Sequence, residues 1–215
     1  MKKIKYSEIT PEKIYNNRRS FIKSIGFGTG LIATSSFPFL NNALANNESK
    51  LTSYKDITTY NNYYEFGTAK GDPYKNAQNF KTEPWNISIE GEVENPINIS
   101  MEEISDEFTS EERILRLRCV EGWSMVIPWM GFSLNQLLSK VTLTSKAKFV
   151  EFESVYDPEQ MRGQRSPVLN WPYKEGLRID EAMHPLTTVV TGLYNKKLPN
   201  QNGAPLRIFI PWKYG

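Results

Sequence analysis

The sequence has very few of the residues that usually build metal and redox sites. Its 215 residues include one cysteine, Cys119, and one histidine, His184. A single cysteine excludes an intramolecular disulfide. Together the two residues exclude a zinc site of the Cys/His type and argue against a di-iron site built from histidines and glutamates. The chain also lacks the G-x-S-x-G elbow of many serine hydrolases. Any metal in this protein must therefore use few protein ligands.

Positive charge is concentrated at the N-terminus. Residues 1–45 hold seven lysines and arginines against two acidic residues, so the total charge of +2 leaves −3 on residues 46–215. A protein that binds nucleic acid needs a basic face to neutralise phosphates, so we expect no nucleic-acid partner. The content of 39% hydrophobic and 13% aromatic residues fits one globular domain.

The first 45 residues are typical of an export signal. Paired arginines at positions 18–19 precede an uncharged apolar run at residues 25–40, and the small residues Ala-Leu-Ala follow and end at position 45. The run is interrupted by glycines and a proline and is shorter than the roughly 20 apolar residues that span a bilayer. We therefore predict a cleaved twin-arginine signal over residues 1–45 and a domain over 46–215, exported folded to the periplasm. Export in the folded state is common for proteins that receive a cofactor in the cytoplasm.

Hydrophobic periodicity predicts a strand-rich α+β domain. Apolar and polar residues alternate over residues 85–89 and again over 97–99, on either side of a turn signal, which is typical of a β-hairpin. The same alternation over residues 111–119 predicts a strand that ends at Cys119. Further strands are predicted at residues 148–154, 187–194 and 206–210.

Two short helices are predicted from capping patterns. Ser100 with Glu103 forms a capping-box signature for a helix that runs to about residue 108. Ser133 with Gln136 repeats the pattern before a leucine-rich segment. Residues 156–176, rich in proline, glycine and arginine and without a clear period, are predicted to be a long loop that is functional or mobile.

The residues around Cys119 leave two interpretations open. A lone thiol in an exported protein is either buried and inert or bound to a ligand. Arg116 and Arg118 bring positive charge that favours a thiolate, which is a soft metal ligand. One cysteine does not complete most coordination sets, so a cofactor that brings its own sulfur ligands would fit. His184, followed by Pro185, is interpreted as a structural residue that helps to end a short helix.

Several segments resemble one family in the same order. The sequence RLRCVEGWSMVIPW at residues 116–129 closely resembles the molybdenum-ligating segment of the periplasmic protein-methionine-sulfoxide reductase catalytic subunits, molybdopterin enzymes with the sulfite oxidase fold. The other matching segments are YNNYYEFG at 60–67, DPEQM at 157–161, DEAMHPL at 180–186, QNGAPLR at 201–207 and PWKYG at 211–215. The resemblance covers the signal and residues 57–215, and it implies the same molybdopterin-binding fold.

The resemblance implies a role for individual residues. Cys119 would be the thiolate ligand of molybdenum, beside the two dithiolene sulfurs of one molybdopterin without a nucleotide. Glu121, two residues further on, would influence the proton-coupled chemistry at the metal. Considered alone, Asn202 before Gly203 is equally compatible with a turn. The residues at cofactor-contacting positions are Asn61, Tyr64, Glu65, Ser154, Asn202 and Arg207. Ser154 stands where the family typically has threonine, which has the same hydroxyl group. The planar guanidinium of Arg207 suits the two oxygens of a phosphate.

The implied activity is oxygen-atom transfer from methionine sulfoxide in oxidised periplasmic proteins. Electrons would come from the quinone pool through a haem-containing membrane subunit, and the catalytic subunit would be a monomer. The family continues past the Trp-Lys-Tyr-Gly motif into a segment that contacts the cofactor phosphate, so we expect this chain to be incomplete at its C-terminus.

Other functions stay open at the level of sequence. The sulfite-oxidising branch of the fold runs the transfer in the opposite sense, and anionic sulfite calls for cationic groups at the substrate site. A cofactor-free exported binding module would recognise a protein or peptide through the five tryptophans and eleven tyrosines. A Ser-His-Asp hydrolase is disfavoured by the missing elbow and by Pro185 after His184.

Overall fold

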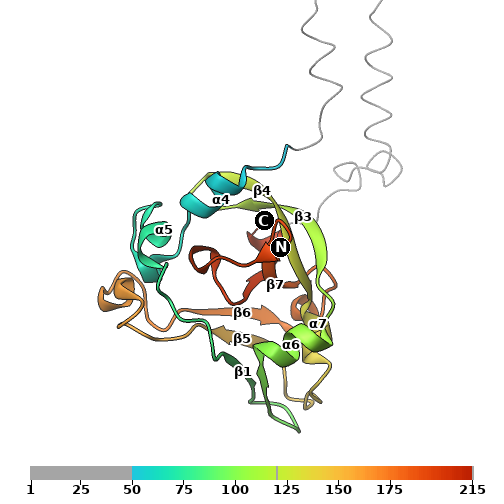
Figure 1. Ribbon diagram of the computed structural model, residues 1–215. Coiled ribbons are helices and arrows are strands. Elements are labelled where there is room, and N and C mark those ends of the chain that lie inside the picture. The colour runs from blue at the N-terminus through green and yellow to red at the C-terminus, as the bar shows by residue number, and fades with distance from the viewer. Residues whose placement is uncertain (1–49, 120, 215) are drawn as a thin grey trace, which may run out of the picture. The chain divides into compact units, whose positions relative to one another are not determined.

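The computed structural model describes residues 50–119 and 121–214, so the predicted signal and its cleavage site lie outside the described residues. Within the described part, none of the helices combines the length and apolar character needed to cross a membrane. The first elements are α4 (Tyr54–Thr59), the 3-10 helix η2 (Tyr64–Phe66) and α5 (Asp72–Asn76). They bring the segment that holds the YNNYYEFG motif next to the central sheet described below (Figure 1).

An antiparallel sheet forms the centre of the described domain. Its strands are β3 (Glu111–Arg118), β4 (Ser124–Ser133), β7 (Thr188–Leu193), β8 (Lys196–Lys197) and β9 (Arg207–Phe209). The order is β3-β4-β7-β8, and β9 also pairs with β7. These strands confirm the predictions at residues 111–119, 187–194 and 206–210, and the β3–β4 connection carries Cys119.

Strand β4 was not predicted from the sequence. Most of its residues are buried on both faces, so its sequence lacks the alternation that marks a strand with one solvent-exposed face. It also contains Pro128, which has no backbone N–H to donate. The structure accommodates this proline, and its carbonyl accepts a hydrogen bond from the backbone N–H of Tyr194 at 2.9 Å.

Two hairpins accompany the central sheet. The predicted hairpin is confirmed by β1 (Asn86–Ile89) and β2 (Ile97–Ser100), which pair antiparallel. The second consists of β5 (Phe149–Glu153), which confirms the prediction at residues 148–154, and β6 (Lys174–Arg178). The remaining elements are α6 (Met101–Glu107), α7 (Leu134–Leu138), η3 (Arg162–Arg165), α8 (Ile179–Ala182), η4 (Asn200–Asn202) and α9 (Pro211–Tyr214).

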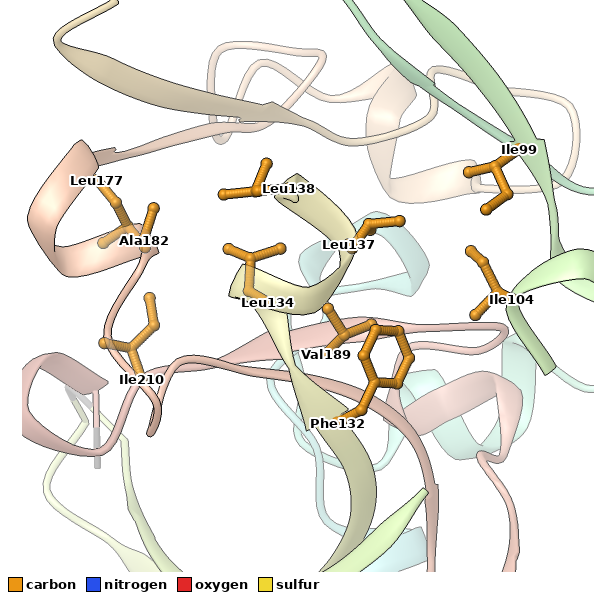
Figure 2. Packing of buried hydrophobic residues seen from close by; sticks show 10 residues of the cluster. All are labelled: Ile99, Ile104, Phe132, Leu134, Leu137, Leu138, Leu177, Ala182, Val189 and Ile210. Atoms are coloured by element: carbon orange, nitrogen blue, oxygen red, sulfur yellow. The ribbon is translucent and has the colours of Figure 1, made fainter. Parts of the chain in front are cut away.

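Apolar packing holds the C-terminal end of β4 in place. Figure 2 shows α7 inserted between side chains from α6, β2, β7, β6, α8 and the segment after β9. Each fully buried aliphatic side chain contributes roughly 1.5–3 kcal/mol, so this cluster holds α7 and the end of β4 firmly. Its members are Ile99, Ile104, Phe132, Leu134, Leu137, Leu138, Leu177, Ala182, Val189 and Ile210.

The two capping predictions had different outcomes. Around α6 the capping box is present, because the Ser100 hydroxyl accepts from the Glu103 N–H and the Glu103 carboxylate accepts from the Ser100 N–H. Helix α7 exists, but the capping prediction for Ser133 with Gln136 is wrong. The Ser133 hydroxyl instead accepts from Arg113 Nη2 at 2.9 Å and donates to the Pro185 carbonyl at 2.6 Å.

Residues 156–176 are more ordered than predicted. The segment contains η3 and the first residues of β6, so the prediction of one long loop is wrong in that respect. The buried Gln164 side chain accepts from the Asp157 N–H and donates to the Val155 carbonyl. Such bonds between side chain and backbone leave no periodic trace in the sequence, which is why the order was missed.

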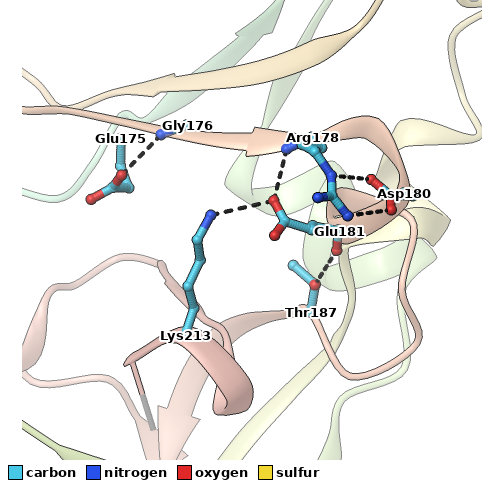
Figure 3. A network of polar contacts seen from close by, with 7 residues as sticks. All are labelled: Glu175, Gly176, Arg178, Asp180, Glu181, Thr187 and Lys213. Carbon is cyan, nitrogen blue, oxygen red and sulfur yellow. Dashed lines mark hydrogen bonds and ion pairs between the residues drawn. The ribbon is translucent and has the colours of Figure 1, made fainter. Parts of the chain in front are cut away.

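Glu181 links α8 to α9 (Figure 3). Its carboxylate accepts hydrogen bonds from the backbone N–H of Arg178 at 2.9 Å and from Lys213 Nζ at 3.3 Å. These groups, the Arg178 N–H first, hold the pKa of Glu181 below its ordinary value. His184 follows α8 as interpreted from the sequence, and its Nδ1 accepts a hydrogen bond from the Leu186 N–H.

We expect Glu181→Gln to lower the melting temperature at pH 7 but not in acid. A carboxyl whose folded pKa is depressed stabilises the protein above its unfolded pKa of about 4.3, and the stabilisation is lost as the pH falls through the folded pKa. Thermal unfolding of both proteins between pH 7 and pH 3 checks this. A deficit in Tm of equal size at both ends of the range would contradict it.

Candidate functional site

Cys119 lies in the tight connection between β3 and β4. Its N–H donates to the Trp123 carbonyl at 2.9 Å, and its carbonyl accepts from the Gly122 N–H at 3.0 Å. Gly122 has a φ of +89°, a conformation that favours glycine. The cysteine is buried, and its Sγ accepts a hydrogen bond from Asn62 Nδ2 at 3.6 Å. The thiol is therefore held in a defined position against the 60–67 segment.

A pocket adjoins this thiol. It is narrow in the cofactor-free chain: its cavity volume for a water-sized molecule is only about 10 Å³. Three parts of the chain line it: residues 57–63, the two strands on either side of Cys119, and the pair Asn202 and Arg207. Asn62, which contacts the cysteine sulfur, is one of the lining residues. The structure therefore brings together motifs that are about 140 residues apart in the chain.

Two buried asparagines contribute polar groups to the pocket lining. Asn61 Nδ2 and Asn202 Nδ2 both donate to the Ile57 carbonyl, at 2.9 and 3.0 Å. Because their amino groups are held by one acceptor, the side-chain oxygens of both residues remain buried without a partner among the described residues. Both oxygens are acceptors that require a donor from a bound molecule.

Arg207 is clamped between two aromatic rings. Its guanidinium lies 5.3 Å from the Tyr63 ring centre and 5.2 Å from that of Trp129. Its Nη1 donates to the Asn202 carbonyl at 3.1 Å, while its Nε is buried and unpaired in the described structure. The two rings hold the guanidinium in place and leave its Nε donor available.

The unpaired buried groups of the described residues all belong to this pocket. They are Asn61 Oδ1, Asn202 Oδ1, Arg207 Nε, Trp129 Nε1 and Trp123 Nε1, the last of which is still near enough to Glu121 to help lower the pKa of that carboxyl. An unsatisfied buried polar group costs roughly 1–3 kcal/mol, so proteins rarely gather several in one place without a ligand. The set contains both donors and acceptors, and its ligand must therefore offer both as well.

A second cluster of polar side chains lies near Cys119, outside the pocket lining. The Glu121 carboxylate accepts from Tyr64 Oη at 2.7 Å and pairs with Lys70 Nζ at 2.5 Å. Lys70 first, then Tyr64, holds the pKa of Glu121 below its ordinary value, and the bond to Glu121 raises the pKa of Tyr64. Lys70 and Tyr64 lie near enough to Cys119 to interact electrostatically with it. Lys70 was missed in the sequence because its neighbour Glu121 is 51 residues away.

Glu65 and Ser154, like Tyr64, Cys119 and Glu121, lie outside the pocket lining. Glu65 is half-buried, and burial raises its pKa while the nearby charge of Arg207 acts against that rise. Ser154 follows β5, and its N–H donates to the Tyr173 carbonyl at 2.9 Å. Tyr173 is itself within electrostatic reach of Glu65. The roles predicted for all the site residues, Cys119, Glu121, Asn61, Tyr64, Glu65, Ser154, Asn202 and Arg207, stay predictions.

The described residues offer a metal few ligands. No three or more His, Cys, Asp and Glu side chains gather in a metal-binding group within residues 50–119 and 121–214. A metal bound to Cys119 must therefore obtain most of its ligands from a cofactor, as the composition of the sequence indicates.

Gly163 in η3 packs closely against the backbone of the 60–67 segment. A Cβ at this position would lie 1.9 Å from the Tyr64 carbonyl oxygen and 2.7 Å from that of Glu65. We expect Gly163→Ala to lower the free energy of unfolding by about 1–3 kcal/mol, because backbone must move. Gly176→Ala is the matched control, since its Cβ would meet only the Val150 oxygen at 4.0 Å. Urea unfolding measures both variants, and equal stabilities would contradict the packing described.

Comparisons with known proteins identify the family. Residues 74–215 match the oxidoreductase molybdopterin binding domain. The chain is 49% identical to the protein-methionine-sulfoxide reductase catalytic subunit MsrP of Xanthomonas axonopodis, over 97% of this chain and 69% of that protein. It is 47% identical to the protein of the same name from Burkholderia mallei, over 97% of this chain and 68% of that one.

A solved structure shows the same fold. The sulfane dehydrogenase SoxCD from Paracoccus pantotrophus superposes with a TM-score of 0.51 at 12% identity, over 94% of this chain and 55% of the other. At this identity the likeness concerns the fold alone, and this chain spans little more than half of that protein. The predicted α+β, strand-rich molybdopterin-binding fold is confirmed.

The pocket fits the cofactor that the family implies. The pterin ring of molybdopterin offers N–H and amino donors for the oxygens of Asn61 and Asn202. The ring carbonyl and the phosphate of molybdopterin offer acceptors for Arg207 Nε. The dithiolene sulfurs would supply the ligands that the chain itself lacks around Cys119. The chain is therefore an oxidoreductase with a molybdenum–molybdopterin cofactor, and it belongs to the family of protein-methionine-sulfoxide reductase catalytic subunits.

Proposed function

We propose that this chain reduces methionine sulfoxide to methionine in oxidised proteins of the periplasm. One observation carries the proposal: the single thiol of the chain is held against a pocket of unpaired donors and acceptors that fits molybdopterin. The names of the similar proteins from Xanthomonas and Burkholderia support the choice of substrate. The reaction consumes one sulfoxide, two electrons and two protons and yields one thioether and one water.

The pocket residues and the cluster of Tyr64, Lys70 and Glu121 have different roles in this reaction. Bound molybdopterin supplies the oxygen-accepting, two-electron redox chemistry. Cys119 provides the protein's thiolate ligand, and Asn62 orients its sulfur. Asn61, Asn202 and Arg207 hold and orient the cofactor through groups that are otherwise unpaired.

Two hydrogen-bond donors lie beside Cys119. The Tyr64 hydroxyl and the Lys70 ammonium both donate to Glu121, within electrostatic reach of Cys119. This cluster would place two hydrogen-bond donors near the oxygen of a bound sulfoxide. Glu121 aligns them, which is the role that we propose for it.

We further propose that the electrons come from the quinone pool through a haem-containing membrane subunit, and that the chain is exported folded by the twin-arginine route. The paired arginines, the interrupted apolar run and the Ala-Leu-Ala sequence support the export route. A folded route is suited to a protein whose cofactor is enclosed by segments from both ends of the domain.

The paired charges of Lys70 and Glu121 favour a neutral sulfoxide over anionic sulfite as the substrate. Lys70, the cation that interacts with Cys119, is already paired with the Glu121 carboxylate. A sulfite site would need an uncompensated positive charge. The pairing of Lys70 therefore supports a neutral substrate.

The proposal is tested with chain purified from a host that makes molybdopterin. An oxidised, unfolded protein substrate and a reduced viologen dye are supplied, and mass spectrometry follows the loss of single oxygens from methionine. We expect dye oxidation to match the loss of sulfoxide oxygen one for one. Rapid sulfite oxidation with ferricyanide, and no loss of sulfoxide oxygen, would instead place the chain in the sulfite-oxidising branch.

A further inference from the structure

Trp129 has a polar group that the proposed mechanism does not yet use. The residue lies in the middle of β4, is 0% exposed, and lines the pocket next to Cys119. Its indole N–H finds no hydrogen-bond partner in the described part of the chain. An indole N–H only donates, so it can be satisfied only by an acceptor that a bound molecule brings.

Packing prevents the ring from turning to find another partner. In the sheet Trp129 pairs with Arg113 of β3 and Leu193 of β7, so backbone contacts hold it on both sides. Its ring contacts Phe209 at 5.6 Å between centroids, and the Arg207 guanidinium covers it at 5.2 Å. The cost of the unpaired N–H is therefore fixed in the cofactor-free chain.

The position next to Arg207 indicates what the indole binds. Arg207 Nε is also buried and unpaired, and its guanidinium is stacked on the Trp129 ring. Two donors in stacked groups suit a part of the cofactor that is rich in oxygen acceptors, such as the phosphate or the pterin carbonyl.

We propose that Trp129 is a cofactor-binding residue whose indole N–H donates a hydrogen bond to an oxygen of bound molybdopterin. The inference rests on the same cofactor site as the proposed function. It adds a donor from the central strand to the groups supplied by the 60–67 and 201–207 segments.

Trp129→Phe separates this role from a purely structural one. Phenylalanine keeps a ring for Arg207 and Phe209 but removes the unpaired donor. We expect the Tm of the cofactor-free variant to fall by only a few degrees, because the cavity left by the smaller ring is partly offset by removal of the unpaired donor, and the molybdenum retained after prolonged dialysis to fall at least fivefold. Trp85→Phe, a tryptophan of the separate cluster with Phe66 and Phe80, is the matched control and should change neither quantity.

The outcomes distinguish the inference from the function. Wild-type retention of molybdenum in Trp129→Phe would overturn the inference and leave the proposed function intact, whereas a wild-type chain that binds no molybdenum would overturn both. A large fall in Tm together with lost retention would indicate packing alone. A second measurement keeps the test valid if the variant misfolds: in chain with nitrogen-15 tryptophan, the Trp129 indole N–H resonance, distinguished from that of Trp123 by a Trp123→Phe sample, should shift downfield and exchange more slowly on cofactor loading. An unchanged Trp129 resonance would overturn the inference.

Discussion

Cys119→Ser is expected to abolish molybdenum binding and sulfoxide reduction together. Serine keeps the size of the side chain but replaces the only thiol of the protein, a soft donor, with a hydroxyl. The loss should exceed the roughly 10–100-fold that removal of an outer-shell partner costs in metal sites. Elemental analysis and the viologen assay on the same preparations measure the two effects.

The control for this substitution lies in the same connection. Ser124→Ala changes the first residue of β4, which is exposed and faces Arg118 across the sheet. It should retain wild-type molybdenum and activity, and in the cofactor-free state both variants should melt within a few degrees of the wild type. A Cys119→Ser variant with wild-type molybdenum content would refute the assignment of the ligand.

Arg207→Lys is expected to have the second-largest effect. Lysine keeps the charge but loses the planar fork, the buried Nε donor and the stacking between Tyr63 and Trp129. One hydrogen bond to a charged group is worth about 1.5–3 kcal/mol, which corresponds to roughly a tenfold to hundredfold loss of cofactor affinity. Molybdenum content after dialysis reports this loss directly.

Arg178→Lys is the matched control for the arginine fork. Arg178 Nε and Nη2 both donate to the Asp180 carboxylate on the exposed surface, at 2.9 and 2.6 Å. This substitution should leave cofactor retention unchanged, because the pair lies outside the pocket. If Arg178→Lys lost as much molybdenum as Arg207→Lys, the effect would be one of general stability rather than of cofactor binding.

Strands with one exposed face could be predicted, and strands buried on both faces could not. Strand β3 alternates between partly buried and exposed residues along most of its length, so period two is visible in its sequence. Strand β4, which it pairs with, is apolar almost throughout and contains Pro128. Its structure depends on burial between β3 and β7, which is a property of the tertiary fold.

The site was predictable where a residue lies in a recognisable motif. The Asn61, Asn202 and Arg207 predictions each fall in a quoted segment, and the structure gathers all three in one pocket. Lys70 and Trp129 were missed for a different reason. Their importance comes from an ion pair with Glu121 and from an unpaired N–H, and both features exist only in the folded chain.

The central claim is that the pocket beside Cys119 holds a molybdenum–molybdopterin cofactor. The most direct test is the molybdenum content of the purified wild-type chain, by elemental mass spectrometry, from a host that also loads a known molybdopterin enzyme. The account predicts close to one molybdenum per chain. A chain that is folded by circular dichroism and carries no molybdenum, while the known enzyme in the same cells is fully loaded, would contradict it.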